Sequence, residues 1–159
     1  MIYINDLLDI LSSDGFLFAD DTKILREILR KEDSLALQSD INKLEEWTKK
    51  WLLKFNTSKC HVLTLGKLEN IRYVYRYSIA GEELEHVFSE KDLGVIIDSD
   101  LTFEEHITTK IKKANQMMGL VRRSFTFLDG NTFTRLYTTI VRPHLEYGQA
   151  VWSPHLKKY

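Results

Sequence analysis

The chain has 159 residues, of which 43% are hydrophobic and 28% charged, and its formal net charge is −1 at neutral pH. This composition is typical of a globular protein with a real core and excludes the disordered and collagen-like classes. A lone cysteine, Cys60, excludes an internal disulfide framework, and we expect neither a secretory leader nor a membrane span, because the apolar runs are interrupted by charges.

The charges are unevenly distributed along the chain. Residues 1–101 carry 13 Lys and Arg against 19 Asp and Glu, whereas residues 102–159 carry 9 against 4. A basic final third suggests an anionic partner for that part of the chain. On charge alone, a solvated helical surface explains the pattern equally well.

The first elements surround a pair of carboxylates. Residues 1–11 are apolar enough for a helix packed in a core, and SSDG at 12–15 ends it with turn formers. In GFLFADDTKIL, at 15–25, two short apolar arms flank a polar centre that contains Asp20 and Asp21. This pattern predicts a β-hairpin with both carboxylates near its turn.

A long helix and further strands are expected next. Residues 34–55 place apolar side chains three or four positions apart, which predicts an amphipathic helix. These positions are Leu37, Ile41, Leu44, Trp47 or Thr48, and Trp51. HVLTLG at 61–66 predicts a short strand, and KDLGVIID at 91–98 predicts another. Between them, YRYSIAGEEL at 75–84 predicts a hairpin, because apolar and polar residues alternate over 73–79.

From residue 102 onward the periodicity becomes helical. Thr102 and Glu105 fit a capping box at the start of a long helix. Its predicted buried stripe consists of Ile107, Ile111, Ala114, Met118 and Val121. A second helix is expected over 133–140, and Pro143 should interrupt or kink it. We therefore predict an α+β protein, with a mixed part at 1–100 and a helical, basic part at 101–159.

Adjacent aspartates beside Phe16, Leu17 and Phe18 indicate a metal site. Burying two like charges there costs several kcal/mol unless a cation compensates them. Mg²⁺ prefers hard oxygen ligands and accepts one or two carboxylates together with water and phosphate oxygens, which suits phosphoryl chemistry. The simpler alternative is a solvated turn, in which Asp is common.

FLFADDTKIL, at 16–25, resembles the FADD or YADD box of reverse transcriptases from non-LTR, jockey-like (LINE-type) retrotransposons. Other segments match that family in the same order: IYINDLL at 2–8, LQSDINKLEEWTKKWLLKFNTSKC at 37–60, KDLGVIID at 91–98, and a helical remainder that contains RPHLEYGQAVW at 142–152. The resemblance implies a partial polymerase palm over 1–100, in which antiparallel hairpins pack on helices, and a helical thumb over 101–159.

The resemblance also implies catalytic roles. Asp20 would be the stronger metal ligand and Asp21 its weaker neighbour, while Lys59 is a candidate proton donor to the departing pyrophosphate. A surface lysine after a helix end explains Lys59 equally well. Leu93 and Gly94 would form the tight strand behind the primer, with Gly94 allowing close backbone approach, although Gly94 taken alone could equally mark a bulge.

On the thumb side, four basic residues of the long helix are expected to contact phosphates: Lys112, Lys113, Arg122 and Arg123. The implied cofactor is Mg²⁺, with Mn²⁺ as an alternative, and the implied partners are an RNA template, a DNA primer and deoxynucleoside triphosphates. The family further implies an intracellular site of action in the nucleus and cytoplasm. We expect Trp47, Trp51 and Trp152 to pack in the core rather than to stack on bases.

The family holds two metal ions with three aspartates, and the D-x-x-x-A-F-D segment that supplies the third does not occur in these residues. We therefore expect a fragment of an RNA-directed DNA polymerase that has no polymerase activity by itself. The alternative is a non-catalytic nucleic-acid-binding module or relic derived from the polymerase. A receiver-like signalling domain would also place Mg²⁺ on an acidic pair, but it requires alternating βαβ units that the pattern lacks.

Overall fold

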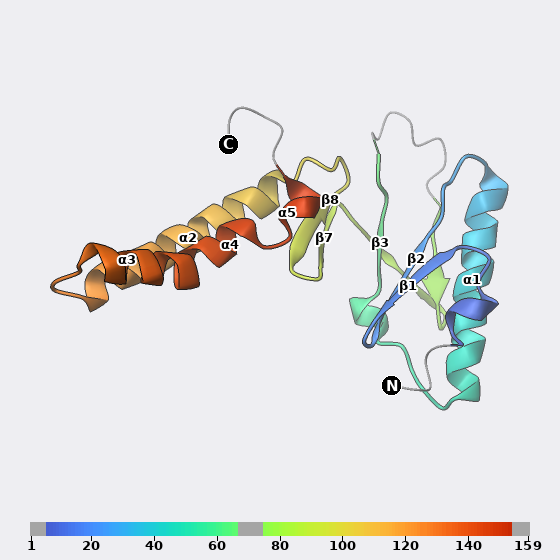
Figure 1. Ribbon diagram of the computed structural model, residues 1–159. Coiled ribbons are helices and arrows are strands. Elements are labelled where there is room, and N and C mark those ends of the chain that lie inside the picture. The colour runs from blue at the N-terminus through green and yellow to red at the C-terminus, as the bar shows by residue number, and fades with distance from the viewer. Residues whose placement is uncertain (1–5, 67–74, 154–159) are drawn as a thin grey trace. The chain divides into compact units, whose positions relative to one another are not determined.

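The computed structural model describes residues 6–66 and 75–153, and the chain divides into two compact units, Met1–Val87 and Phe88–Tyr159 (Figure 1). Both units combine helices and short strands, which agrees with the predicted mixed α+β class. The division lies ahead of residue 100, so the hairpin that ends at Asp98 belongs to the same unit as the long helix that follows it. Among the helices in the described ranges, none has the length and apolar character that a membrane span requires.

Unit 1 consists of hairpins and one long helix. Its elements are η1 (Leu8–Ile10), β1 (Asp14–Phe18), β2 (Asp21–Leu25), α1 (Lys31–Lys50), η2 (Thr57–Lys59), β3 (His61–Leu63), β4 (Ser78–Ile79), β5 (Glu82–Glu83) and β6 (Glu85–Val87). The pairs β1–β2 and β4–β5 are antiparallel, whereas β3 pairs with β6 in parallel. The predicted hairpin over 15–25 is confirmed. The helix predicted over 1–11 is wrong for residues 6–11, where the chain forms only the single turn η1, and residues 1–5 lie outside the described ranges.

The predicted stripe on α1 forms much of the unit 1 core. Ile41 packs with Tyr77, Ile79 and Leu84, and a second cluster joins α1 to η1. The members of the second cluster are Leu7, Leu44 and Trp47. Burying such apolar side chains contributes roughly 1.5–3 kcal/mol each, which is why the stripe determines the face that the helix buries.

Trp51 departs from the predicted stripe. The helix ends at Lys50, and Leu52, at φ 55°, turns the chain away. The Trp51 ring therefore remains 40% exposed, tilted against Trp47 with ring centroids 5.9 Å apart. The prediction that this tryptophan packs in the core was wrong, whereas Trp47 and Trp152 are both buried as predicted.

Unit 2 places a hairpin at one end of a helical pair. Its elements are β7 (Ser89–Asp92), β8 (Val95–Asp98), α2 (Glu104–Ser124), α3 (Gly130–Leu136), the π-helical turn η4 (Tyr137–Val141), α4 (Arg142–Glu146) and α5 (Gln149–Trp152). Figure 1 shows α3 and α4 running back along α2. The core at the hairpin end comprises Val95, Phe103, Ile107 and Trp152.

The start of α2 differs from the predicted capping box. The Asp98 carboxylate accepts hydrogen bonds from the amides of Thr102 and Phe103, at 3.0 and 2.6 Å. Glu105 instead accepts a bond from the Ser89 hydroxyl at 3.1 Å. The prediction of a capping box was wrong, because Asp98, at the end of the preceding strand, accepts the free amides before the helix.

Along α2, the predicted stripe is buried at Ile107, Ala114 and Val121 but not at Ile111, which is 43% exposed. The interruption predicted at Pro143 is confirmed. The π-helical turn η4 precedes α4, and the proline occupies the first turn of α4, where its missing amide costs least.

Candidate functional site

The predicted acidic pair lies at a two-residue turn. β1 and β2 pair from Asp14 with Leu25 to Phe18 with Asp21, so Ala19 and Asp20 form the turn and Asp21 begins β2. Ala19 has φ 56°, in the left-handed region that costs a non-glycine residue about 1 kcal/mol or more. Strain of this kind is often concentrated at functional turns.

The environment of the acidic pair differs from the buried one expected. Asp20 and Asp21 are both exposed, and Phe16 and Phe18 are 56% and 60% exposed on the outer face of the hairpin. Only the alternate residues of the hairpin, such as Leu17 and Ile24, pack against the core. The prediction that the two carboxylates are buried, and therefore need a metal ion, was wrong. The structure holds them as a neighbouring, exposed pair on a turn.

A buried carboxylate fixes the base of this hairpin to α1. Asp40 is fully buried and accepts hydrogen bonds from the amides and hydroxyls of both Ser12 and Ser13, at 2.6–3.1 Å. Lys43 Nζ lies 2.8 Å from Asp40 Oδ1, and Arg26 donates to both serine hydroxyls from the far end of β2. One end of the hairpin therefore bonds directly to Asp40, and the other end is linked to it through the two serine hydroxyls, while Asp20 at the turn is exposed.

Sequence reasoning missed Asp40, although one signal was present. The residue lies on the apolar side of α1, one position before Ile41 and four before Leu44. A charged residue on such a stripe needs partners, because an isolated buried charge is too costly to keep. The stripe alone, however, does not say that the partners are Ser12 and Ser13.

Lys59, the third predicted catalytic residue, is exposed at the end of η2. The segment from Asn56 to Lys59 forms a single tight turn, in which the amide of Lys59 donates to the carbonyl of Asn56 at 3.0 Å. In the described parts of the chain, no ion pair joins Lys59 to Asp20 or Asp21. The structure thus exposes all three predicted catalytic residues without bringing the lysine into contact with the carboxylates.

Leu93 and Gly94 occupy a turn rather than a strand. KDLGVIID forms the end of β7 and all of β8, and between them Leu93 and Gly94 have φ of 45° and 85°. Two positive φ values are typical of a type I′ hairpin turn. The prediction of one continuous strand was wrong because the leucine and glycine reverse the chain.

A side chain of the protein itself packs closely on Gly94. A Cβ at Gly94 would lie 3.0 Å from Cε1 of Tyr147, and the Tyr147 hydroxyl donates to the carbonyl of Leu93 at 2.7 Å. Lys110 Nζ lies 5.1 Å from the centroid of the same ring, a cation–π arrangement. Tyr147, which sequence reasoning left without a role, therefore connects the turn to α4 and α2.

The four predicted phosphate contacts are all exposed on α2: Lys112, Lys113, Arg122 and Arg123. At 3.6 residues per turn, Lys112 and Arg123 lie within about 20° of one direction. Lys113 and Arg122 fall on the two flanks of this line. No acidic residue follows Glu105 on the helix, so every charged residue after its first turn is basic.

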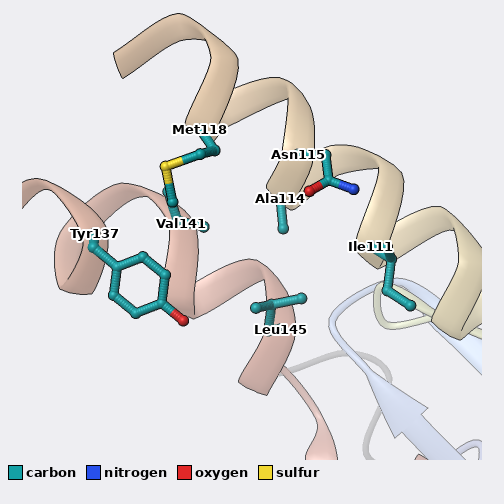
Figure 2. A pocket seen from close by; sticks show the side chains of 7 residues that line it. All are labelled: Ile111, Ala114, Asn115, Met118, Tyr137, Val141 and Leu145. Carbon is teal, nitrogen blue, oxygen red and sulfur yellow. The ribbon is translucent and has the colours of Figure 1, made fainter. Parts of the chain in front are cut away.

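A shallow cavity of about 300 Å³ lies between α2 and the returning helices. Figure 2 shows its lining side chains, which are mostly apolar: Ile111, Ala114, Asn115, Met118, Tyr137, Val141 and Leu145. None of the predicted catalytic or phosphate-binding residues lines it. The cavity therefore belongs to the packing of the helices rather than to the candidate site.

His106 connects the hairpin of unit 2 to α2. Its ring is fully buried, and Nδ1 accepts the amide of Ile96 at 3.0 Å, which leaves the proton of the neutral ring on Nε2. Nε2 is buried without a hydrogen-bond partner, and the ring lies against Trp152. Burial, and to a smaller extent the charge of Lys110, lowers the pKa of His106 below its ordinary value.

This shift predicts that unit 2 becomes less stable in mild acid. Because the pKa of His106 is lower in the folded protein, the unfolded chain binds the proton first, and the stability present above about pH 6.5 is lost progressively below it. Thermal unfolding of the full chain at pH 7.5 and 5.5 should show this loss. His106→Gln should reduce the pH dependence, whereas His86→Gln, at an exposed position, should preserve it. An unchanged pH dependence in H106Q would contradict the assignment.

In the described ranges, no three His, Cys, Asp or Glu side chains gather closely enough to hold a metal ion. The acidic turn thus offers two carboxylates and no third. The other oxygen ligands of an ion at this turn would have to come from water, from a bound phosphate, or from another polypeptide segment.

Comparison with known proteins gives a consistent result. The chain is 34% identical over 153 residues to the RNA-directed DNA polymerase from mobile element jockey of Drosophila funebris, and 27% identical over 154 residues to the jockey polymerase of Drosophila melanogaster. It is 28% identical over 152 residues to the probable RNA-directed DNA polymerase from transposon X-element of Drosophila melanogaster. Each match covers 89% of this chain and 16% of the relative, so the chain spans about a sixth of the length of these curated relatives. No protein-family profile matches the chain, and no solved structure matches it significantly.

Proposed function

The chain is homologous to one segment of the RNA-directed DNA polymerases of jockey and other non-LTR transposons, and from this premise we propose that it forms the part of such a polymerase that carries the acidic hairpin and a basic thumb. In this proposal residues 1–100 are part of the palm and residues 101–159 are the thumb. The observation that carries it is the placement of Asp20 and Asp21 at a strained turn, whose base is fixed by Asp40. A rigid base with an exposed acidic turn suits a site that must meet a primer end.

The donor set of the turn fits a divalent metal ion, with Mg²⁺ preferred and Mn²⁺ as an alternative. Asp20 and Asp21 supply hard carboxylate oxygens, and Mg²⁺ is commonly bound by one or two carboxylates. When bound, such an ion activates the attacking oxygen and stabilises the leaving one. Ala19 leaves room for the primer end beside these carboxylates, and Lys59 is the candidate donor of a proton to the departing pyrophosphate.

The partners of the complete polymerase, in this proposal, are an RNA template, a DNA primer and deoxynucleoside triphosphates, and its place of action is intracellular, in the nucleus and cytoplasm. Leu93 and Gly94, held by Tyr147, would contact the primer, and the four basic residues of α2 would hold phosphates. These contacts set affinity and its salt dependence without reading sequence.

By itself the chain should not catalyse polymerisation. Its two candidate ligands lack the third aspartate of the D-x-x-x-A-F-D segment, which is absent from these residues. A second candidate function, a non-catalytic nucleic-acid-binding module, is favoured by the basic residues that α2 carries after its first turn, with no acidic residue among them. Primer extension by the purified chain, abolished by Asp20→Ala, would contradict the expected inactivity.

Metal binding at the turn can be tested without activity. We expect Mn²⁺ added to the full chain to broaden the backbone amide NMR signals of residues 19–22, since a paramagnetic ion relaxes only nearby nuclei. Asp20→Asn combined with Asp21→Asn should abolish this broadening. The matched control is Glu82→Gln with Glu83→Gln, which removes a second exposed pair of adjacent carboxylates from the β4–β5 hairpin. Equal broadening at both acidic pairs would argue against a specific site at Asp20.

A further inference from the structure

Exposed aromatic residues follow the end of α2 along the chain. Phe125 and Phe127 come directly after the helix and are 43% and 85% exposed, and Phe133 within α3 is 39% exposed and stacks on Tyr137. An exposed group of large apolar side chains at one place commonly marks an interaction site. In Figure 1 this connection forms the end of unit 2 remote from its hairpin.

The same place is strongly basic. Arg122 and Arg123 occupy the last turn of α2, and Arg135 lies on α3. The single acidic residue between Glu105 and Glu146 is Asp129. Its carboxylate accepts the amides of Asn131 and Thr132 at the start of α3 and keeps its negative charge. Three arginines against this one aspartate leave the local net charge positive, so a partner with negative charge is favoured there.

Rings and guanidinium groups together match one class of partner. Single-stranded nucleic acid presents unpaired bases, which stack on aromatic side chains, and a phosphate backbone, which basic residues hold. In a duplex the base faces are already covered by their neighbours, so exposed rings would contribute little to binding it.

We propose that the tip segment, residues 122–127, binds single-stranded nucleic acid, with Phe125 and Phe127 stacking on bases and Arg122 and Arg123 holding phosphates. The proposal rests on the proposed function, since homology to a nucleic-acid polymerase favours this partner over an anionic membrane. It adds two residues and a strand preference to the phosphate contacts assigned to α2. The unpaired template strand is the natural ligand of such a site.

The test measures binding of the full chain to fluorescein-labelled single-stranded 20-mers of dT and U, and to a 20-base-pair duplex, by anisotropy over a range of salt. We expect Phe125→Ala with Phe127→Ala to weaken single-strand binding at least about tenfold. Duplex binding and the slope of log K against log salt should be unchanged. Arg122→Gln with Arg123→Gln should weaken binding to both ligands and reduce the single-strand slope by about 1.4.

Further variants separate stacking from other uses of the rings. Phe127→Ala alone alters a side chain with little packing to lose, and Phe127→Leu keeps an apolar group without an aromatic face. Both should show the same loss of single-strand binding. Phe88→Ala is the matched control, because Phe88 is 71% exposed in the same unit but outside the tip segment, and it should bind as the parent does.

Several results would overturn the inference. Parental single-strand affinity in the double phenylalanine variant or in F127L would do so while leaving the proposed function intact. So would phenylalanine-dependent binding to phosphatidylserine vesicles without binding to single strands. If the parent chain binds neither nucleic acid at low salt, the inference fails together with the proposed thumb. The Mn²⁺ experiment on Asp20 and Asp21 then decides separately whether the metal site of the proposal survives.

Discussion

Replacing Asp40 by alanine should lower the free energy of unfolding of unit 1 by about 3 kcal/mol. The carboxylate is fully buried. It accepts hydrogen bonds from Ser12 and Ser13 and forms an ion pair with Lys43. Its removal leaves two backbone amides and a partly buried ammonium group without their acceptor, and hydrogen bonds to a charged group contribute about 1.5–3 kcal/mol each. The loss is expected to stay below that sum because water can reach the serines.

The measurement is urea denaturation followed by tryptophan fluorescence, to which Trp47 in unit 1 contributes, together with hydrogen exchange of residues 12–25. The control is Asp33→Ala on the same helix, which removes a half-buried carboxylate that accepts the amides of Leu29 and Arg30 at the helix start, and it should cost about 1 kcal/mol. Exchange in the hairpin should accelerate in D40A but not in D33A. Equal stability of the two variants would show that Asp40 does not anchor the hairpin.

The same carboxylate predicts a second loss of stability in strong acid. Burial raises its pKa, but hydrogen bonds from Lys43, Ser13 and Ser12 outweigh burial and hold the pKa of Asp40 well below its ordinary value. The unfolded chain therefore takes up this proton first, and the stability contributed above about pH 4 is lost as the pH falls further. This window lies below the one that His106 governs, so the two units should respond to acid at different pH.

Asp20→Asn should reduce RNA-templated DNA synthesis at least about a thousandfold in a complete polymerase that contains this segment. Loss of a metal ligand removes several kcal/mol of transition-state stabilisation, and about 4 kcal/mol corresponds to that factor. The polymerase would be a chimera in which this chain replaces the matching segment of the jockey polymerase of Drosophila funebris. Primer extension on an RNA template measures the effect.

Matched substitutions in the same chimera separate the proposed roles. Glu82→Gln changes an exposed carboxylate on another hairpin and should leave the rate unchanged. Lys59→Gln should reduce the rate about a hundredfold if the lysine donates a proton, a typical size for general acid catalysis. If D20N retained the activity of the unsubstituted chimera, Asp20 would not be a metal ligand of the polymerase.

Local pattern was sufficient for the acidic hairpin and the long helices. The arms of 15–25 and the polar residues between them predicted β1, β2 and the turn, because a two-residue turn depends on neighbours in the chain. The stripe on α1 was predicted for the same reason, down to Ile41 and Leu44. The resemblance to non-LTR transposon polymerases followed from motifs in order along the chain, and the 34% identity to a jockey polymerase over 89% of the chain agrees with it.

Local pattern failed where a strand ends within an apolar run. KDLGVIID predicted a single strand because its leucine, valine and isoleucines favour strands, although Gly94 between them is a common turn residue. The positive φ of Leu93 and Gly94 instead makes a turn, and Tyr147 holds it from 54 residues away. The exposure of Phe16 and Phe18 was missed likewise, because a strand pattern shows that two faces alternate but not that one of them lacks a cover.

The sequence by itself determined that two carboxylates stand at a hairpin turn, that a basic helix follows, and that both resemble one segment of the non-LTR transposon polymerases. Only the tertiary structure decided which side chains hold these elements: Asp40 binds Ser12 across 28 residues, and Tyr147 binds Leu93 across 54. Helix and strand periodicity arises from interactions over a few residues, so it predicts elements well. Hydrogen bonds between distant residues depend on how the chain folds back on itself, so they cannot be predicted from periodicity.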